Sequence, residues 1–282
     1  MSVATKAQLR AEAIKPNIGT RITNSKEELL SGELATEIRD LLEQRGVLVF
    51  PQIGFTDEEQ VAFTKTMGTF APEMHDKDGE ETVHPITLDE SVNATATYLR
   101  GSLYWHIDGT MNKVPIRASL LRCVKPSPKG TGNTGVANTY AAYDALPEEL
   151  KAEYDGYKVR HGAWPTLLYW NPEPDQELLE RMQGIGDVEI PLVWKHESGR
   201  KSLVIGNTAH TISGKSHFDS VRILNKLREW ATQEQFVYSH EWSVGDLIIW
   251  DNTGTMHRAE AYDLSTGRLM VRTKLEGEEP IQ

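Results

Sequence analysis

The segment "VGDLIIWDNTGTMHRAEAYDLSTGRLMVRTKLEG" (residues 244–277) decides the fold class, because it pairs short strand patterns with polar turns. The run "LIIWD" (247–251) is apolar and bounded by Gly and Asn, which is typical of a buried strand. His257 follows after a short loop and is therefore expected at the edge between a strand and a loop. A last strand is predicted over 268–275.

The rest of the chain shows a similar sequence pattern, which predicts short strands, Gly- and Pro-rich connections and a few helices. Strands are predicted over 47–50, 118–124 and 202–206, and helices over 33–45 (ended by Gly46), over 57–67 (opened by Thr56 and Glu59), near 147 and near 219. We therefore expect a mainly β protein with peripheral helices, a β-sandwich or jelly roll, forming a single domain over 1–282.

Composition limits the possible functions. The 282 residues carry a net charge of -11, which argues against a nucleic-acid partner. No apolar run is long enough for a membrane span, and the first residues lack the apolar region of a secretory signal. The one cysteine, Cys123, lies in an apolar strand pattern, so we expect an inert thiol and a cytoplasmic location.

The stretch "YWHIDGTM" (104–111) holds the candidate metal ligands. On a strand, His106 and Asp108 project to the same face and can share one metal ion. A distant histidine such as His257 would complete a 2-His-1-carboxylate triad, which leaves open positions on Fe(II). The alternative is a hydrogen-bonded pair at a strand end. A second His-x-Asp, at 217–219, opens a helical pattern in which its two side chains diverge.

Two arginines form a candidate anion clamp. In strand geometry Arg268 and Arg272 lie on one face with Met270 between them and no acidic neighbour on that face of the strand, although an exposed strand face is the alternative. The strand expected to carry His106 projects Ser102 and Tyr104 to the same side, where they would line the substrate site.

Two further segments hold weaker candidates. The aromatic residues of 160–174 are expected either to line an apolar pocket or to pack in the core; they are Trp164, Tyr169 and Trp170. His84 is expected in a loop, and Trp105 and Trp250 are expected to pack near the metal.

Four blocks of this sequence resemble one family, the Fe(II)/2-oxoglutarate-dependent dioxygenases of the taurine dioxygenase and 2,4-dichlorophenoxyacetate dioxygenase type. They are "WHIDGTM" (105–111), "GNTGVANTYAAYDALPEEL" (132–150), "IPLVWKHESGRKSLVIG" (190–206) and "GDLIIWDNTGTMHRAEAYDLSTGRLMVR" (245–272). The resemblance implies a double-stranded β-helix, a distorted jelly roll, with iron held at one mouth.

By that resemblance, His106, Asp108 and His257 match the iron ligands. Thr134 and Arg268 match the residues that hold the distal carboxylate of 2-oxoglutarate. Arg272 matches a position that binds the substrate anion or supports the cosubstrate.

The implied reaction uses Fe(II), 2-oxoglutarate and O2 to hydroxylate, and where the chemistry allows to cleave, a small or medium organic acid with an apolar or aromatic body. It releases succinate and CO2. Ser102 stands where taurine-type members have asparagine, so taurine is not the expected substrate, and Asp108 argues against halogenation. We expect a homo-oligomer without nucleic-acid or membrane partners. The rival interpretations are a zinc-dependent hydrolase and a non-catalytic jelly-roll binding module.

Overall fold

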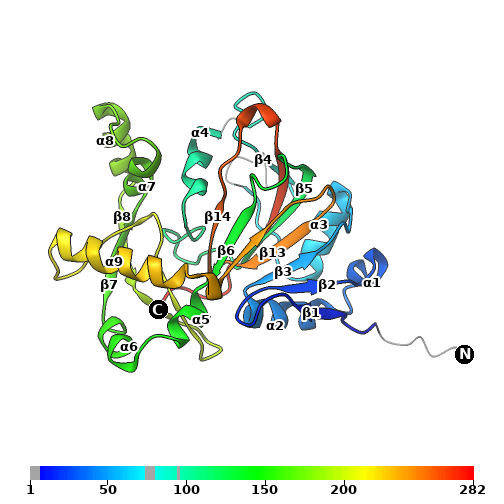
Figure 1. Ribbon diagram of the computed structural model, residues 1–282, viewed down its shortest axis with the longest axis horizontal. Helices are drawn as coiled ribbons and strands as arrows, with labels where there is room; N and C mark the ends of the chain where they lie inside the picture. Colours follow the sequence, from blue (N-terminus) through cyan, green and yellow to red (C-terminus); the bar gives the residue numbers. More distant parts are fainter. Residues whose placement is uncertain (1–6, 74–79, 94–95) are drawn as a thin grey trace, which may run out of the picture.

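The computed structural model describes residues 7–73, 80–93 and 96–282 (Figure 1). Its strands are β1 (Ala11–Ala13), β2 (Thr20–Ile22), β3 (Val47–Phe50), β4 (His84–Ile86), β5 (Ala118–Lys125), β6 (Thr134–Asn138), β7 (Lys158–Gly162), β8 (Asp187–Pro191), β9 (Val193–Lys195), β10 (Lys201–Leu203), β11 (Ala209–Ile212), β12 (Val237–His240), β13 (Leu247–Asp251), β14 (Thr255–Ala259) and β15 (Leu269–Leu275). Its α-helices are α1 (Lys26–Leu30), α2 (Ala35–Arg45), α3 (Asp57–Thr66), α4 (Ala96–Leu99), α5 (Thr139–Asp144), α6 (Glu148–Tyr154), α7 (Ala163–Trp170), α8 (Gln176–Gly184) and α9 (His217–Ala231). Three 3₁₀ helices are η2 (Arg100–Leu103), η3 (Glu234–Phe236) and η4 (Leu264–Thr266).

None of the helices in the described ranges is both long and apolar enough to cross a lipid bilayer.

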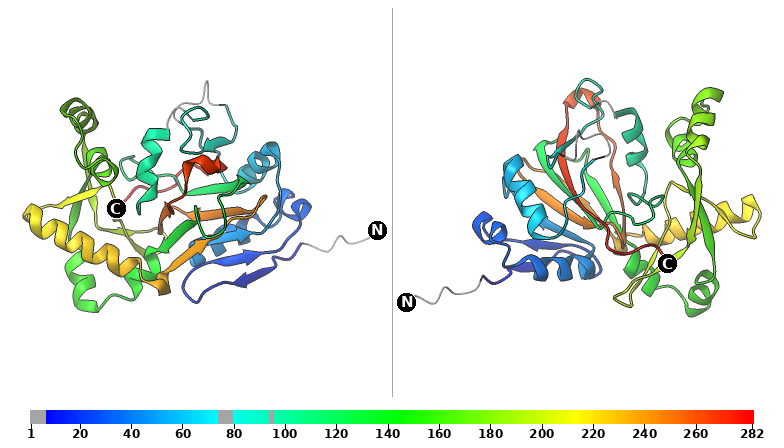
Figure 2. Two further views of the ribbon diagram at one scale, coloured as in Figure 1. Left: turned by 45° about the horizontal axis from the view of Figure 1, so that its top comes forward. Right: turned by 180° about the vertical axis from the view of Figure 1, so that it is seen from behind.

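Two sheets carry the functional part of the molecule. The large sheet has the strand order β1-β2-β3-β13-β5-β15-β4, and a smaller sheet has the order β12-β6-β14. The β2–β3 pair is parallel, whereas β3, β13, β5 and β15 pair antiparallel in turn. A third sheet, β11-β7-β8, lies on the side that carries α7, α8 and α9 (Figures 1 and 2).

The apolar core follows the alternation of the large sheet's strands. In β3, Leu48 and Phe50 face a core shared with α1, α2 and α3, while Val47 and Val49 face a core that includes Val136 of β6. The strand β13 divides in the same way, with Ile249 toward the helices and Ile248 toward β6. Residues 47–50 of β3 and 247–250 of β13 are all apolar because both faces of these strands are buried.

A further core lies on the other side of the small sheet. Ala137 of β6 and Met256 of β14 pack there with Leu224 and Leu227 of α9 and with Val159 of β7. The small sheet is therefore covered on both faces, by the large sheet on one side and by α9 and the third sheet on the other.

Most predicted elements are confirmed. Helix α2 ends at Gly46, whose φ of +73° favours glycine. Helix α3 begins with the expected capping box of Thr56 and Glu59. The strands over 47–50, 118–124, 247–251 and 268–275 match β3, β5, β13 and β15, and His217–Asp219 does open α9.

Several predictions of local structure are wrong. His257 lies inside β14 and not at a strand edge. The strand predicted over 202–206 ends at Leu203, because Gly206 and Asn207 turn the chain beside His106. His84 lies in β4, paired with β15, and not in a loop.

Candidate metal centre

The two histidines meet through an isolated antiparallel bridge. The backbone N–H of His106 donates to the carbonyl of His257 at 3.0 Å, and the N–H of His257 donates back to His106 at 2.9 Å. Directly opposed residues in an antiparallel pair place their side chains on the same side. The two imidazole rings accordingly lie with centroids 4.1 Å apart.

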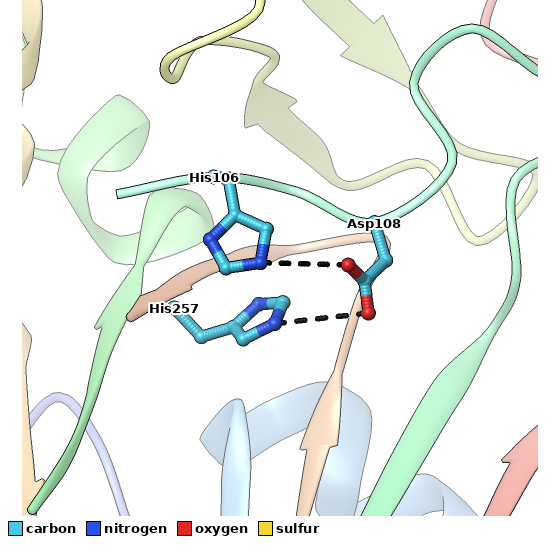
Figure 3. Close-up of side chains that lie close together, drawn as sticks. All are labelled: His106, Asp108 and His257. Carbon is cyan, nitrogen blue, oxygen red and sulfur yellow. Dashed lines mark ion pairs between the residues drawn. The ribbon is translucent and has the colours of Figure 1, made fainter. Parts of the chain in front are cut away.

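Asp108 joins them two residues further along. One carboxylate oxygen lies 3.5 Å from Nε2 of His106, and the other lies 3.7 Å from Nε2 of His257 (Figure 3). One ligand atom from each of the three side chains lies within 4.8 Å of the other two. The sequence therefore identified three residues that the fold brings together from positions about 150 residues apart.

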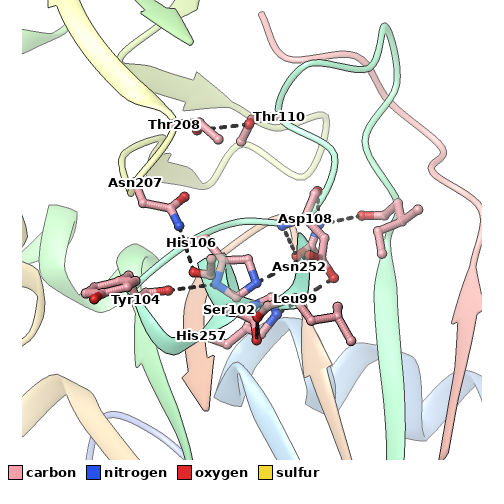
Figure 4. Close-up of polar contacts among 12 residues, drawn as sticks. Leu99, Ser102, Tyr104, His106, Asp108, Thr110, Asn207, Thr208, Asn252 and His257 are labelled. Carbon is pink, nitrogen blue, oxygen red and sulfur yellow. Dashed lines mark hydrogen bonds and ion pairs between the residues drawn. The ribbon is translucent and has the colours of Figure 1, made fainter. Parts of the chain in front are cut away.

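Asn252 holds the backbone of Asp108 in place. Its side-chain oxygen accepts from the Asp108 N–H at 3.0 Å, and its amide nitrogen donates to the Asp108 carbonyl at 2.6 Å (Figure 4). The sequence analysis did not single out this residue. Its position directly after the strand "LIIWD" could have indicated a structural role, since a polar residue at a buried strand end requires a hydrogen-bond partner.

The hydrogen bond of His106 fixes its tautomer. Its Nδ1 lies 2.9 Å from the carbonyl oxygen of Tyr104, which can only accept, so Nδ1 carries the proton. In the neutral ring, Nε2 then presents a lone pair toward Asp108. Metal-binding histidines commonly show this arrangement.

The charge states of the other two groups suit a divalent cation. Burial opposes ionisation of Asp108, but the positively charged Arg272 guanidinium beside it favours the carboxylate, and the pKa of Asp108 lies well below the usual range. Burial lowers the pKa of His257, and the neighbouring His106 adds to this, so His257 is neutral. A metal requires a deprotonated carboxylate and neutral imidazoles. The three groups therefore fit a metal ion.

Arg268 and Thr134 are both buried, in the region between the two sheets. Nε of Arg268 donates to the carbonyl of Gly132 at 3.0 Å, the Tyr262 ring lies 5.1 Å from its guanidinium carbon, and Nη2 has no hydrogen-bond partner in the described ranges. A buried, unpartnered guanidinium nitrogen is costly unless an anion meets it. The site therefore fits a carboxylate.

Arg272 does not present the free cationic face that the sequence predicted. Its Nη2 lies 2.8 Å from Oε1 of Glu73, and its Nη1 lies 3.3 Å from Oδ2 of Asp108. Lys274 approaches the second oxygen of Glu73 at 2.8 Å. Strand spacing could not reveal Glu73, because it comes from a segment about 200 residues away.

The clamp prediction also assumed regular alternation from Arg268 to Arg272. Arg268 instead lies just before β15 begins at Leu269, and the pairing with β5 is irregular there because Val124 is an extra residue of β5. The two guanidinium groups share no hydrogen-bond partner in the parts of the chain that the structure describes.

The strand predicted to carry Ser102 and Tyr104 beside His106 is absent from the described structure. Ser102 lies in η2, and its hydroxyl donates to the Leu99 carbonyl at 2.6 Å. Tyr104 is not in a strand, and its ring packs 5.1 Å from the Tyr169 ring. Asn207 holds this segment in place, because its backbone N–H donates to the Trp105 carbonyl and its side-chain amide donates to the Gly101 carbonyl.

The aromatic segment forms α7 and borders a cavity of about 310 Å³ between α7, β11 and α9. Trp164, Tyr169 and Arg228 line it, together with Gly206, and a side chain at Gly206 would lie 3.1 Å from the His106 backbone. The sequence left open whether these aromatic side chains line a pocket or pack against neighbours. Trp164 and Tyr169 do both, since they line the cavity and also pack against the rings of His210 and Tyr104. Two tryptophans were expected to pack near the metal. The Trp250 ring lies 4.5 Å from the His257 ring, and the Trp105 ring lies under the Arg258 guanidinium.

Comparison with known proteins identifies the family. Residues 10–274 match the model of the "Taurine catabolism dioxygenase TauD, TfdA family". The chain belongs to this family. This dioxygenase is 32% identical over 237 residues to the (S)-phenoxypropionate/alpha-ketoglutarate-dioxygenase of Sphingobium herbicidovorans, covering 82% of each chain. It is also 32% identical to the alpha-ketoglutarate-dependent 2,4-dichlorophenoxyacetate dioxygenase of Cupriavidus pinatubonensis, covering 87% of this chain and 89% of the relative.

A solved structure shares the fold of this dioxygenase. AAD-2 in complex with Mn(II) and N-oxalylglycine superposes with a TM-score of 0.82 at 29% identity, covering 98% of this chain and 100% of that chain. The predicted fold, a distorted jelly roll with peripheral helices, is thereby confirmed. The relatives favour a dioxygenase over both a zinc-dependent hydrolase and a binding module.

Proposed function

We propose that this dioxygenase uses Fe(II), 2-oxoglutarate and O2 to hydroxylate a small or medium organic acid with an apolar or aromatic body, releasing succinate and CO2. The observation that carries the proposal is that His106, Asp108 and His257 each place a ligand atom within 4.8 Å of the other two, close enough to bind one metal ion. Such a triad leaves coordination positions open for the two cosubstrates.

In this proposal the three side chains hold the metal ion. The Tyr104 carbonyl keeps the Nε2 lone pair of His106 available, and Asn252 fixes the backbone that carries the Asp108 carboxylate. Bound Fe(II) and 2-oxoglutarate would supply the activation of O2. The protein would supply ligands that are already oriented and in the required charge states.

The distal carboxylate of 2-oxoglutarate would be held by Arg268 and Thr134. The unpartnered Nη2 of Arg268 supports this assignment, because a buried guanidinium gains a charge-assisted hydrogen bond when a carboxylate arrives. The hydroxyl of Thr134 would add a second donor.

The substrate class rests on the relatives and on the cavity. Two relatives are named for phenoxypropionate and 2,4-dichlorophenoxyacetate, which combine a carboxylate with an aromatic body. The aromatic lining of the cavity beside Gly206 suits such a body. Where the hydroxylated carbon carries an ether oxygen, the product would fall apart and the ether would be cleaved.

Several assignments stay predictions. Arg272 would meet the substrate anion or support the cosubstrate, and Ser102 and Tyr104 would line the substrate side. A cytoplasmic location, a single domain and a homo-oligomeric state likewise rest on the sequence alone.

Anaerobic titration tests the proposal directly. Adding Fe(II) and then 2-oxoglutarate should produce the weak visible charge-transfer band of the chelate, and aerobic incubation with aryloxy acids should then stimulate succinate release. His257→Ala should abolish both signals, while Glu149→Ala, an exposed residue of α6 away from the metal ligands and the cavity, should leave them unchanged. Succinate release by His257→Ala at the wild-type rate would refute the ligand assignment.

A further inference from the structure

Thr134 has a buried hydrogen-bond partner that the proposed reaction does not yet use. The indole Nε1–H of Trp242 donates to Oγ1 of Thr134 at 3.1 Å, and both side chains are more than nine-tenths buried. Trp242 follows β12 and is held edge-on against the His240 ring, with centroids 4.5 Å apart and planes at 90°. Its orientation toward Thr134 is therefore fixed by packing.

This contact determines what the Thr134 hydroxyl can do. An indole N–H only donates, so Oγ1 is the acceptor in this bond. The hydroxyl proton must then point away from Trp242, and Oγ1 makes no other hydrogen bond in the described ranges. Thr134 is thus left with one unused donor in a buried position, where an unused donor is costly.

A second unused donor, Nη2 of Arg268, belongs to a side chain that is anchored close to Thr134 in the sequence. Arg268 is anchored by its Nε to the carbonyl of Gly132, two residues before Thr134, and its Nη2 is buried without a partner in the described ranges. A side chain at Gly132 would lie 3.1 Å from Cδ of Arg268, so the backbone and the arginine are packed closely here. In the proposed function, both donors meet the distal carboxylate of 2-oxoglutarate.

We propose that Trp242 is a positioning residue for the cosubstrate. By occupying the acceptor side of the Thr134 hydroxyl, its N–H directs the hydroxyl proton toward the distal carboxylate of 2-oxoglutarate. This inference rests on the proposed function, in which Thr134 and Arg268 hold that carboxylate. Trp242 itself touches neither the metal ligands nor the cosubstrate, and it acts through Thr134.

The inference makes a selective prediction. Trp242→Phe keeps an aromatic ring but removes the N–H, so the Thr134 hydroxyl can rotate and its donor is no longer directed. The affinity for 2-oxoglutarate should fall by about tenfold, the size expected for weakening one hydrogen bond to a charged group. The affinity for 2-oxopentanoate should not change, because this 2-oxo acid has the same chain length but ends in a methyl group.

The experiment is an anaerobic titration of the Fe(II)-loaded protein with each 2-oxo acid, with the dissociation constant read from the visible charge-transfer band. Trp194→Phe is the matched control, because Trp194 is also buried, stacks on His196 and has an indole N–H without a partner in the described ranges. It should bind both acids as the wild type does. In a Thr134→Val background, Trp242→Phe should have little further effect.

The outcomes separate this inference from the proposed function. If the wild type gives no band with 2-oxoglutarate, the proposed function fails and this inference fails with it. If the wild type binds but Trp242→Phe binds 2-oxoglutarate equally well, or loses affinity for both acids to the same extent, only the role of Trp242 is overturned.

A measurement on the wild type covers the case in which Trp242→Phe does not fold. In the Zn(II)-loaded protein, the indole ¹H–¹⁵N resonance of Trp242 should shift when 2-oxoglutarate is added, and it should shift much less with 2-oxopentanoate. Equal shifts with the two acids, or no shift with either, would overturn the proposal.

Discussion

Glu73 changes what Arg272 can be expected to bind. Strand spacing identified Arg272 as a cation facing the substrate, but its guanidinium is shared between Glu73 and Asp108. An anionic substrate that approaches Arg272 must therefore compete with the carboxylate of Glu73. This competition is a property of individual side chains and can be tested with one substitution.

We predict that Glu73→Gln lowers the KM for an aryloxy acid substrate by about fivefold, because an amide pairs more weakly with a guanidinium than a carboxylate does. Steady-state succinate release at varied substrate concentration measures this effect. Glu81→Gln, which removes an exposed carboxylate paired with Lys65, is the control and should leave the KM unchanged. A higher KM for Glu73→Gln would show that Glu73 orients Arg272 and does not compete for it.

Asn252 gives a second prediction at the residue scale. Replacing it with alanine removes both hydrogen bonds to the Asp108 backbone, so the carboxylate should lose its fixed orientation. We expect Fe(II) affinity to fall by about tenfold, the lower end of the effects seen for groups that orient metal ligands. Metal titration measures it, and Asn17→Ala, which removes one exposed hydrogen bond, is the comparison. Unchanged metal affinity would remove Asn252 from the site.

At the scale of elements, the sequence revealed the strands whose two faces are both buried. Residues of β3, β5 and β13 are mostly apolar, since each strand lies inside the large sheet, and the predicted boundaries were close to those observed. The strand β14 was missed because His257 and Arg258 interrupt its apolar pattern. The polar metal-ligand candidate His257 is thus the reason why the sequence pattern did not predict the strand β14 that carries it.

The segment before His106 shows a different limit of prediction from strand alternation. Alternation correctly predicted that His106 and Asp108 project together, although only His106 makes a bridge and Asp108 lies in a turn. Extending the same alternation back to Ser102 failed, because η2 interrupts it. Side-chain amides from Asn207 and Asn252 hold this irregular stretch, and no local pattern predicts such distant partners.

The turn between β13 and β14 supplies a prediction at this scale. Gly254 lies against the buried Tyr140 ring, so a methyl group added at Gly254 would lie 1.6 Å from a ring carbon. We expect Gly254→Ala to lower the unfolding free energy by about 1–3 kcal/mol through overpacking, and also to weaken metal binding by displacing β14. Thermal unfolding and metal titration measure the two effects.

Gly184→Ala is the matched control for that substitution, because nothing lies within 4 Å of the added methyl group and the residue is helical. It should not reduce stability. Equal behaviour of the two variants would contradict the packing argument at the turn.

For the molecule as a whole, the candidate site lies between the two sheets. His257 comes from the small sheet, Arg272 comes from the large one, and Asp108 contacts both of them. The apolar cores explain how the sheets are held together, since the core around Val136 includes residues of both. Such a site cannot be read from any single stretch of sequence, because its geometry depends on the packing of the sheets.

The stability of the whole fold should also depend on pH through a histidine outside the candidate site. His161 of β7 is fully buried, with Nδ1 2.8 Å from the Thr208 hydroxyl and Nε2 without a partner in the described ranges. Burial, with a smaller effect of His210, lowers its pKa to about 3. Below the unfolded-state pKa of about 6.5, the unfolded chain binds a proton that the folded chain excludes, so stability falls as the pH decreases from about 6.5 toward 3.

This linkage amounts to about 2 kcal/mol between pH 7.5 and pH 5. We therefore predict that His161→Gln, which cannot titrate, reduces the difference in unfolding free energy between these two pH values by about that amount. Urea unfolding at both pH values measures it, and the comparison with the wild type cancels the contributions of all other groups. His217→Gln, at an exposed position, should keep the wild-type difference. If His161→Gln also keeps it, His161 is protonated in the folded protein at pH 5, and burial does not control its titration.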